Sequence, residues 1–267
     1  MSGLPILGSD EPWFGGVYAE GVVCVLAPNP GPMTLDGTNT WVLGDGAGAR
    51  IVIDPGPEDA GHLDAVIAAS DGRIGQILLT HGHLDHSEGA RRLHDMTGAR
   101  VRALDPLHRR GGEGLGEGDV VSVGDVDIHV LATPGHTSDS LSFHLPEAGA
   151  ILTGDTVLGR GTTVVAWPDG DLGDYLGSLA ALRLRAERAE ASAILPGHGP
   201  VLRDPVTVID AYLDHRRERL DQVRRAWEDG ARTAEEIVDA VYSDVSESVR
   251  GAALLSTRAQ LAYLERD

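Results

Sequence analysis

The sequence predicts an α/β (α+β) fold in which two β-sheets pack face to face between outer helices, a four-layer αββα sandwich with a small helical appendage. Short apolar runs broken by Gly, Pro and Asp fill the first two thirds of the 267 residues. Helical patterns interrupt these runs at spacings that place helices on the outer faces of two sheets. After Pro205 the sequence becomes charged and helical. We therefore predict a main domain at residues 1–205 and a helical region at residues 206–267.

The main domain is built from strands with three helices between them. Nine apolar runs of strand length carry the β-structure, and each ends at turn-forming residues. We expect strands at Val17 to Ala27, Thr38 to Leu43, Ile51 to Ile53, Gln76 to Thr80, Val101 to Leu104, Val120 to Val123, Val126 to Thr133, Leu141 to Leu145 and Ala150 to Thr153. Helical periodicity predicts helices at Ala60 to Ala69, Glu88 to Thr97 and Asp174 to Glu190.

The helical region has its own start and stop signals. Three helices are expected: Val206 to Asp229, a second that ends at Tyr242, and Ser246 to Glu265. Gly230 ends the first helix, and Thr233 with Glu236 forms a capping box that starts the second. Three helices after a β-rich domain are typical of a winged-helix-like appendage, although no strands follow that could form a wing.

The composition is that of a soluble globular protein, with 42% hydrophobic and 24% charged residues. No apolar run approaches the ~20 residues that a membrane-spanning helix needs. The segment Met1 to Trp13 lacks a basic region followed by an apolar one, so we expect no secretory signal and a cytoplasmic protein. The single cysteine, Cys24, lies in an apolar run and is interpreted as a buried strand residue.

The charge is strongly acidic. The formal net charge is −19, and all 22 cationic side chains are Arg, because the sequence contains no Lys. The absence of Lys excludes Schiff-base catalysis. An acidic surface repels polyphosphate backbones, which disfavours a nucleic-acid substrate without excluding a local Arg patch.

One segment carries the clearest chemical signal. The run Thr80-His81-Gly82-His83-Leu84-Asp85-His86 follows an apolar strand and precedes the helix expected near Ser87 and Glu88. Three imidazoles and a carboxylate crowded at the end of a strand must be solvated, paired or coordinated to a metal. Chance composition rarely produces such a cluster, so we interpret it as a metal site.

Three further candidate ligands lie at the ends of later apolar runs. They are His136 in Thr-Pro-Gly-His-Thr, Asp155 in Leu-Thr-Gly-Asp and His198 in Leu-Pro-Gly-His-Gly. Each alone is a weak signal. Together with the first cluster they give five histidines and two carboxylates, which suits two metal ions with an open position for water.

The order His-x-His-x-Asp-His, followed by His, Asp and His, resembles the signature of the metallo-β-lactamase superfamily across residues of about 20 to 205. Residues 1–205 would then form the catalytic domain. The resemblance implies that His81, His83 and His136 hold one metal ion, that Asp85, His86 and His198 hold a second, and that Asp155 bridges the two. Two Zn²⁺ ions are expected, and the same ligands also suit iron or manganese.

The implied mechanism follows from the charge of the metals. Two divalent ions roughly 3.5 to 4 Å apart lower the pKa of a bridging water to near neutrality, which supplies a hydroxide nucleophile. Asp85 is the expected catalytic residue, because it would orient this hydroxide and accept its proton. The expected substrate is an ester, a thioester or a phosphodiester.

Other segments are similar to the β-lactamase-like protein 2 branch of the superfamily. They are residues 35–41 (Leu-Asp-Gly-Thr-Asn-Thr-Trp), 154–159 with 161–163, and 175–179. That branch is described as acting on single-stranded RNA, and related fungal and bacterial proteins are described as thioesterases. Within these segments we interpret Asn39 as holding a turn, Thr162 and Thr163 as a loop pair, and Tyr175 as a core residue.

Several functions stay open at this point. The acidic charge favours a small ester or thioester substrate, whereas the branch resemblance favours an endoribonuclease. The cluster Arg216, Arg217, Arg219, Arg224 and Arg225 would be a phosphate contact in a nuclease, although interleaved acids favour a solvated salt-bridged face. β-Lactam hydrolysis is disfavoured, because the bridging aspartate is present and the only cysteine is remote. A redox protein with a flavin domain and a metal-binding scaffold without activity are the remaining alternatives, and we interpret the leftover histidines, such as His215, as surface or core residues.

Overall fold

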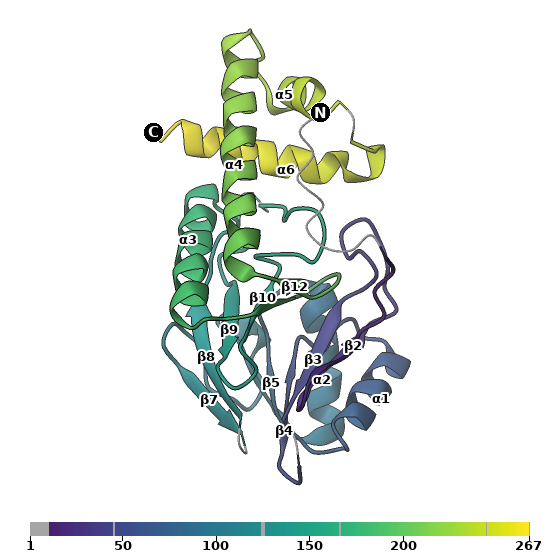
Figure 1. Cartoon of the computed structure of the whole chain (residues 1–267). Coiled ribbons are helices and arrows are strands. Elements are labelled where there is room, and N and C mark those ends of the chain that lie inside the picture. Colours follow the sequence, from purple (N-terminus) through teal and green to yellow (C-terminus); the bar gives the residue numbers. More distant parts are fainter. Residues whose placement is uncertain (1–10, 45, 124–125, 166, 244, 267) are drawn as a thin grey trace.

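A computed structural model of the chain describes residues 11–44, 46–123, 126–165, 167–243 and 245–266. Within these residues two six-stranded sheets pack against each other, with helices on both outer sides (Figure 1). This arrangement confirms the predicted αββα sandwich. Part of the segment that underlies the expectation of no secretory signal, residues 1–10, lies outside the described residues. None of the described helices is long and apolar enough to cross a membrane.

The first sheet is formed by the first six strands in sequence order. They are β1 (Gly16–Ala19), β2 (Val22–Leu26), β3 (Asn39–Leu43), β4 (Arg50–Ile53), β5 (Ile74–Leu78) and β6 (Arg100–Arg102). The strand predicted from Val17 to Ala27 is two antiparallel strands, because Glu20 and Gly21 form a turn and Gly21 has a φ of 70°. The pairs from β1 to β4 are antiparallel, and β4, β5 and β6 are parallel.

The second sheet has the order β12-β11-β10-β9-β8-β7. Its strands are β7 (Val120–Val123), β8 (Val126–Ala132), β9 (Leu141–Leu145), β10 (Ala150–Gly154), β11 (Ala193–Pro196) and β12 (Leu202–Arg203). The sequence pattern did not predict β11 and β12 as strands: β12 has only two residues, and β11 includes Pro196, a residue type that strands rarely contain. β11 pairs in parallel with β10, so the carboxyl ends of these two strands lie at the same edge of the sheet.

Every residue of β3, β4, β9, β10 and β11 is buried, because these strands are covered on both faces. Between the sheets, Trp41 and Ile53 of the first pack with Phe143 and Leu152 of the second. This packing brings the loops at one edge of each sheet together.

Three helices cover the outer faces: α1 (Ala60–Ala69), α2 (Leu84–Thr97) and α3 (Leu172–Arg188). α1 and α2 pack on the first sheet and α3 on the second, as Figure 1 shows. α2 begins four residues before the predicted start at Glu88, directly after His83. A carboxylate in the first turn is stabilised by the helix dipole, so Asp85 favours this early start. A 3₁₀ turn, η1 (Pro106–His108), follows β6.

The C-terminal region has the three expected helices, α4 (Pro205–Glu228), α5 (Ala234–Val241) and α6 (Glu247–Leu264). The predicted capping box of Thr233 and Glu236 at the start of α5 is confirmed. α4 extends away from the sheets and α6 crosses it (Figure 1). The first half of α4 shares one hydrophobic cluster with α3 and the second sheet, through Val208, Ile209 and Tyr212. The division at residue 205 stays a prediction.

Candidate metal centre

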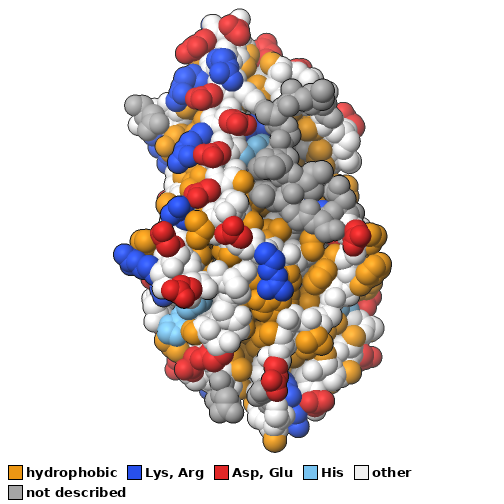
Figure 2. All heavy atoms as spheres, in the orientation of Figure 1, with side chains coloured by type: hydrophobic (Ala, Val, Ile, Leu, Met, Phe, Trp, Pro, Cys, Tyr) orange, Lys and Arg blue, Asp and Glu red, His pale blue; other side chains and the backbone are white. Residues whose placement is uncertain are grey.

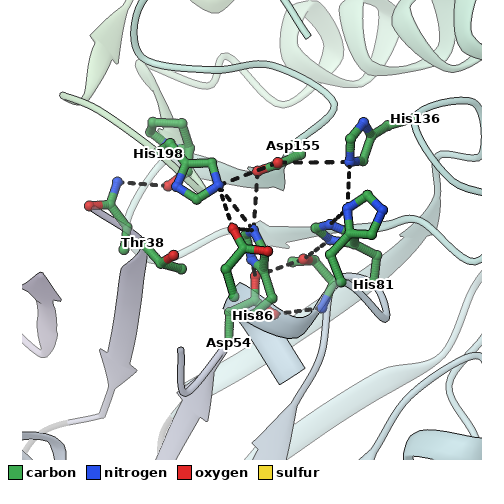
Figure 3. Close-up of polar contacts among 12 residues, drawn as sticks. Thr38, Asp54, His81, His86, His136, Asp155 and His198 are labelled. Carbon is green, nitrogen blue, oxygen red and sulfur yellow. Dashed lines mark hydrogen bonds and ion pairs between the residues drawn. The ribbon is translucent and has the colours of Figure 1, made fainter. Parts of the chain in front are cut away.

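All seven residues predicted as metal ligands converge at one edge of the sandwich (Figure 3). The first sheet contributes four of them, through the loop after β5 and the first turn of α2. The second sheet contributes the other three, from the segments after β8, β10 and β11. The ligand atoms form three mutually close groups: His81, His83 and His136; His81, His86 and Asp155; and Asp85, His86 and His198. The assignment of each ligand to an individual ion stays a prediction.

The first group consists of three imidazoles whose nitrogens face one another. His83 Nδ1 lies 3.0 Å from His81 Nε2 and 3.0 Å from His136 Nε2. These separations match those between ligands that share one ion at the usual metal–nitrogen distance of about 2.0 to 2.1 Å. The arrangement therefore suits one metal ion with three nitrogen ligands.

The group of Asp85, His86 and His198, called the second group from here on, combines two imidazoles and a carboxylate. His198 Nε2 lies 3.2 Å from His86 Nε2 and 3.2 Å from Asp85 Oδ2. Asp155 lies between the two groups, with Oδ1 3.4 Å from His86 Nε2 and Oδ2 3.8 Å from His136 Nε2. Figure 3 shows the Asp155 side chain between His198 and His136. Its position fits the bridging role that the family resemblance implies.

The outer nitrogens of three histidines fix their tautomers. His86 Nδ1 lies 2.9 Å from the Asp54 carboxylate, and His198 Nδ1 lies 3.1 Å from the Gly37 carbonyl oxygen. His136 Nδ1 lies 2.6 Å from the carbonyl oxygen of Val164. Carbonyl and carboxylate oxygens accept hydrogen bonds, so each Nδ1 carries a proton and each Nε2 of the neutral ring presents a lone pair to the centre.

The inward-facing lone pairs show whether the site is suited to a cation. The inner nitrogens of His86 and His198 lie 3.2 Å apart, and both face carboxylates. Such a set of acceptors repels itself unless protons or metal ions lie between them. Asp155 Oδ1 is buried and has no hydrogen-bond partner. The residues therefore fit divalent metal ions of the type that nitrogen and carboxylate ligands bind.

Without a metal, protons supply the missing positive charge. Burial lowers the pKa of His198, but the Asp155 and Asp85 carboxylates outweigh this effect and raise it to about 9. Burial also lowers the pKa of His86, but Asp155 and Asp54 raise it well above the ordinary value. Burial holds the pKa of His81 well below the ordinary value. Metal binding to the second group therefore displaces protons.

Asp54 is a residue of the candidate site that the sequence did not reveal. Its carboxylate accepts hydrogen bonds from Thr80 N at 2.8 Å and Thr80 Oγ1 at 2.7 Å, besides holding His86. It is buried and has a φ of 51°. An aspartate directly after the apolar run Ile51 to Ile53 was a visible signal. The sequence alone could not show that Asp54 contacts His86, because the parallel pairing of β4 and β5 is needed to bring the segments after these two strands together.

A cavity of about 380 Å³ opens beside the metal centre. It reaches from His136 and Asp155 to α4, to Tyr242 at the C-cap of α5, and to α6, so the C-terminal region forms part of its wall. About half of the lining side chains are apolar, and they include Met33, Leu35, Leu158, Val164, Val245, Val249, Ala252 and Ala253. His215, Arg216 and Arg219 of α4 also line the cavity. The cavity combines an apolar wall, a cationic wall and the ligand cluster.

The additional branch motifs have structural roles, but two of them differ from the sequence interpretation: Asn39 begins strand β3 instead of holding a turn, and Thr163 bonds the backbone at Asp155 instead of pairing with Thr162. Asn39 Nδ2 donates to the carbonyl oxygens of Pro196 at 3.0 Å and Gly199 at 2.8 Å, which holds the loop that carries His198. Thr163 Oγ1 donates to the backbone oxygen of Asp155 at 2.6 Å. Tyr175 is fully buried in the core. These residues position the ligand loops.

The arginines of α4 divide into two sets. Arg217 pairs with Asp214 at 2.7 Å, and the pair is exposed. Arg224 forms a similar pair with Asp221 at 3.0 Å. Figure 2 shows cationic and acidic side chains interspersed along this face. The salt-bridged face expected from the sequence is therefore present, but Arg216 and Arg219 face the cavity instead.

Residues 33–198 match the family model described as the metallo-beta-lactamase superfamily. A beta-lactamase-like protein 2 homolog of Caenorhabditis elegans is 34% identical over 93% of this chain and 85% of its own length. An atrochrysone carboxyl ACP thioesterase of Aspergillus fumigatus is 36% identical over 85% of this chain and 75% of its own length.

Solved structures share the fold. A beta-lactamase domain protein from Burkholderia ambifaria has a TM-score of 0.80 at 24% identity and covers 94% of this chain and 88% of its own. A metallo-beta-lactamase family protein from Thermus thermophilus has a TM-score of 0.76 at 24% identity and covers 92% and 93% of the two chains. The family match over residues 33–198 and the relatives above 30% identity show that the chain belongs to the metallo-β-lactamase superfamily of metal-dependent hydrolases.

Proposed function

We propose that the protein uses two metal ions, zinc in the first instance, to hydrolyse a thioester or ester with an apolar acyl group. The observation that carries this proposal is the apolar cavity that opens directly beside the clustered histidines and aspartates. A relative with a thioesterase name, similar over 85% of the chain, supports the same substrate class. Iron or manganese would suit the same ligands.

Two bound divalent ions would lower the pKa of a water held between them and polarise the carbonyl oxygen of the substrate. His81, His83 and His136 would hold one ion, Asp85, His86 and His198 the other, and Asp155 both. The tautomers fixed by the outer hydrogen bonds keep these rings oriented with their lone pairs inward.

Asp85 is the proposed proton acceptor. Burial raises the pKa of Asp85, but the hydrogen bond with His198 and the charge of His86 outweigh it, so the pKa is below the ordinary value. Its side chain is 30% exposed, which lets water reach it. The attacking water would give a proton to Asp85 while its oxygen bonds to the acyl carbon. The carbon–sulfur or carbon–oxygen bond of the substrate would then break, and the leaving sulfur or oxygen would take the proton back from Asp85.

The apolar wall would bind the acyl chain. Met33 and Leu35 come from the loop before β3, and Val245 and Val249 come from the segment around the start of α6. Each methylene group buried there contributes roughly 0.8 kcal/mol to binding.

An endoribonuclease is the second candidate, and Arg216 and Arg219 in the cavity wall are the observation that favours it. A net charge of −19 opposes it. β-Lactam hydrolysis is the less favoured alternative, because Cys24 is buried and donates to Asn39 Oδ1 at 3.3 Å instead of reaching the ligand cluster. A non-catalytic metal-binding role is also less favoured.

The test is metal content together with turnover of a thioester, an activated phosphodiester and a single-stranded RNA. We expect about two metal ions per chain and thioester cleavage that Asp85→Ala reduces by roughly 100-fold or more, the range seen for lost general base catalysis. Asp95→Asn, an exposed change farther along α2, is the matched control and retains wild-type turnover. RNA cleavage with the same Asp85 dependence would support the nuclease instead. Less than one bound metal and no turnover would overturn both.

A further inference from the structure

Arg216 is a buried cation without a carboxylate partner. Only 4% of the residue is exposed, and its Nε atom is buried without a hydrogen-bond partner. Its Nη2 donates to the backbone oxygen of Thr163, and its guanidinium lies 4.9 Å from the centre of the Tyr175 ring. Within the described part of the chain, no acidic side chain lies within ion-pair distance of Arg216. A buried charge is normally paired, so this guanidinium lacks a counter-ion.

Arg219 lies one helical turn from Arg216 on the same side of α4. Its Nη1 donates to Gln222 Oε1 at 2.8 Å and to the Val241 carbonyl oxygen at 3.2 Å. Its guanidinium stacks 4.6 Å from the centre of the Tyr242 ring. These contacts are neutral, and the described residues supply no carboxylate to this guanidinium either. Both arginines are thus held in fixed orientations at the cavity without being neutralised.

Two other arginines of α4 differ from Arg216 and Arg219 in having carboxylate partners. Arg217 and Arg224, which face solvent, are paired with Asp214 and Asp221. In a chain with a net charge of −19, acidic partners are abundant. The cationic wall of the cavity also includes Arg160, which is paired with Asp36. Of the three arginines in the cavity wall, Arg216 and Arg219 are therefore the two to which the described residues supply no carboxylate.

The cavity connects these guanidiniums to the centre. Thr163 accepts a hydrogen bond from Arg216 with its backbone oxygen, and its hydroxyl donates to the backbone oxygen of Asp155 at 2.6 Å. Asp155 and Arg216 line the same cavity. His215 lines the same cavity, and burial together with Arg216 and Arg219 lowers its pKa to about 4, so it is neutral at neutral pH.

We propose that Arg216 and Arg219 form an anion subsite that binds a carboxylate or phosphate group of the substrate beside the metal centre. This inference rests on the proposed function only in that the anion belongs to the molecule that is hydrolysed. A guanidinium presents its N–H groups in a planar fork that matches two oxygens of such a group. The substrate class is accordingly an acidic thioester or ester, with the negative charge either on the acyl chain or on the thiol arm.

The test compares matched thioesters on the metal-loaded protein. One pair differs in the acyl chain, which ends in a methyl group or a carboxylate, and the other differs in the thiol arm, which is pantetheine or 4′-phosphopantetheine. We expect the wild type to prefer one anionic member by about 10- to 100-fold in kcat/KM, the effect of a hydrogen-bonded charge. Arg219→Gln and Arg216→Gln reduce that preference, whereas Arg217→Gln keeps it. The pair that shows the preference identifies the source of the anion.

Arg219→Gln keeps the test valid where Arg216→Gln fails to fold, since Arg219 is less buried. Calorimetric binding of glutarate and of inorganic phosphate to the metal-loaded protein gives a readout that needs no turnover. If no thioester is cleaved but Arg219→Gln weakens binding of either anion about tenfold relative to Arg217→Gln, the proposed function fails and the subsite stands. If thioesters are cleaved without charge preference and the variants bind both anions equally, the subsite fails and the function stands. If the arginine variants change the cleavage of RNA but not of any thioester, the proposed subsite for an acidic thioester or ester is also wrong.

Discussion

Replacing Asp54 with Asn tests how the fold holds the second metal group. Asp54 accepts three hydrogen bonds, two from Thr80 at 2.8 and 2.7 Å and one from His86 Nδ1 at 2.9 Å. In Asp54→Asn, one oxygen becomes an amide nitrogen that donates. The remaining oxygen keeps the hydrogen bond from Thr80 N, which Oδ1 accepts in the wild type. The amide nitrogen then takes the place of Oδ2, which accepts from both His86 and the Thr80 hydroxyl. His86 then carries its proton on the inner nitrogen, where it blocks metal binding.

The magnitude follows from these contacts. Loss of a partner that orients a ligand histidine lowers metal affinity by about 10- to 100-fold. Loss of one hydrogen bond to a buried charged group costs about 1.5 to 3 kcal/mol of folding stability. We expect the variant to retain about one ion per chain, because the group of His81, His83 and His136 does not contact Asp54.

The assay is competitive zinc titration with elemental analysis of the purified variant. Asp105→Asn is the matched control, because this aspartate also follows a strand of the first sheet but only caps Leu107 N at 2.8 Å. We expect the control to bind zinc as the wild type does. Two ions bound to Asp54→Asn with wild-type affinity would refute the tautomer argument.

Three further predictions concern pH, the loop geometry and the cavity wall. In chelator-treated protein, the pKa of His198 is about 9 in the folded state against an ordinary 6.5. Protonated His198 therefore stabilises the fold fully below pH 6.5, and this stabilisation is lost as the pH rises through 9. The Tm should fall over that pH window, and an unchanged Tm would contradict the charge assigned to His198. A Cβ on Gly197 would lie 2.5 Å from Asp155 Oδ1, so Gly197→Ala should abolish binding of at least one metal ion in elemental analysis. Tyr212→Phe should lower the free energy of unfolding in urea by about 1 to 3 kcal/mol, because the Leu158 N–H, 2.9 Å from the tyrosine oxygen, loses its buried acceptor.

Each of these changes has a control in the chain. The metal-loaded protein is the control for the pH prediction, since Nε2 of His198 would then bind a metal ion instead of the proton that is lost near pH 9. Gly177→Ala should leave metal binding intact, because a Cβ there meets no atom within 4 Å. Tyr18→Phe should cost less than Tyr212→Phe, since its hydroxyl contacts only the exposed Arg203 at 3.4 Å. Full metal content in Gly197→Ala, or equal stability in the two Phe variants, would contradict the corresponding argument.

The sequence predicted the fold class and the identity of the clustered residues well, for physical reasons. Apolar runs that end near His81, His136 and Asp155 place the candidate metal ligands at strand ends, where the chain leaves the core. The order of these residues carries the family resemblance without any three-dimensional information. The start of α2 was predicted too late, because the histidines of the motif gave no helical periodicity.

The surroundings of the ligands could not be predicted in the same way. Asp54 reaches His86 only because β4 and β5 are parallel neighbours, and Gly37 reaches His198 only because the two sheets meet at this edge. The arginines of α4 look alike in sequence. Only the packing of α4 against α3 decides that Arg216 is buried while Arg217 is exposed.

The most direct test of the central claim is an activity titration of the metal-free protein with zinc, using a thioester with an apolar acyl chain. The account predicts that turnover rises with added zinc and saturates near two ions per chain. Full turnover in the chelated protein, or binding of two zinc ions with no thioester cleavage at all, would contradict the proposed metal-dependent thioester hydrolysis.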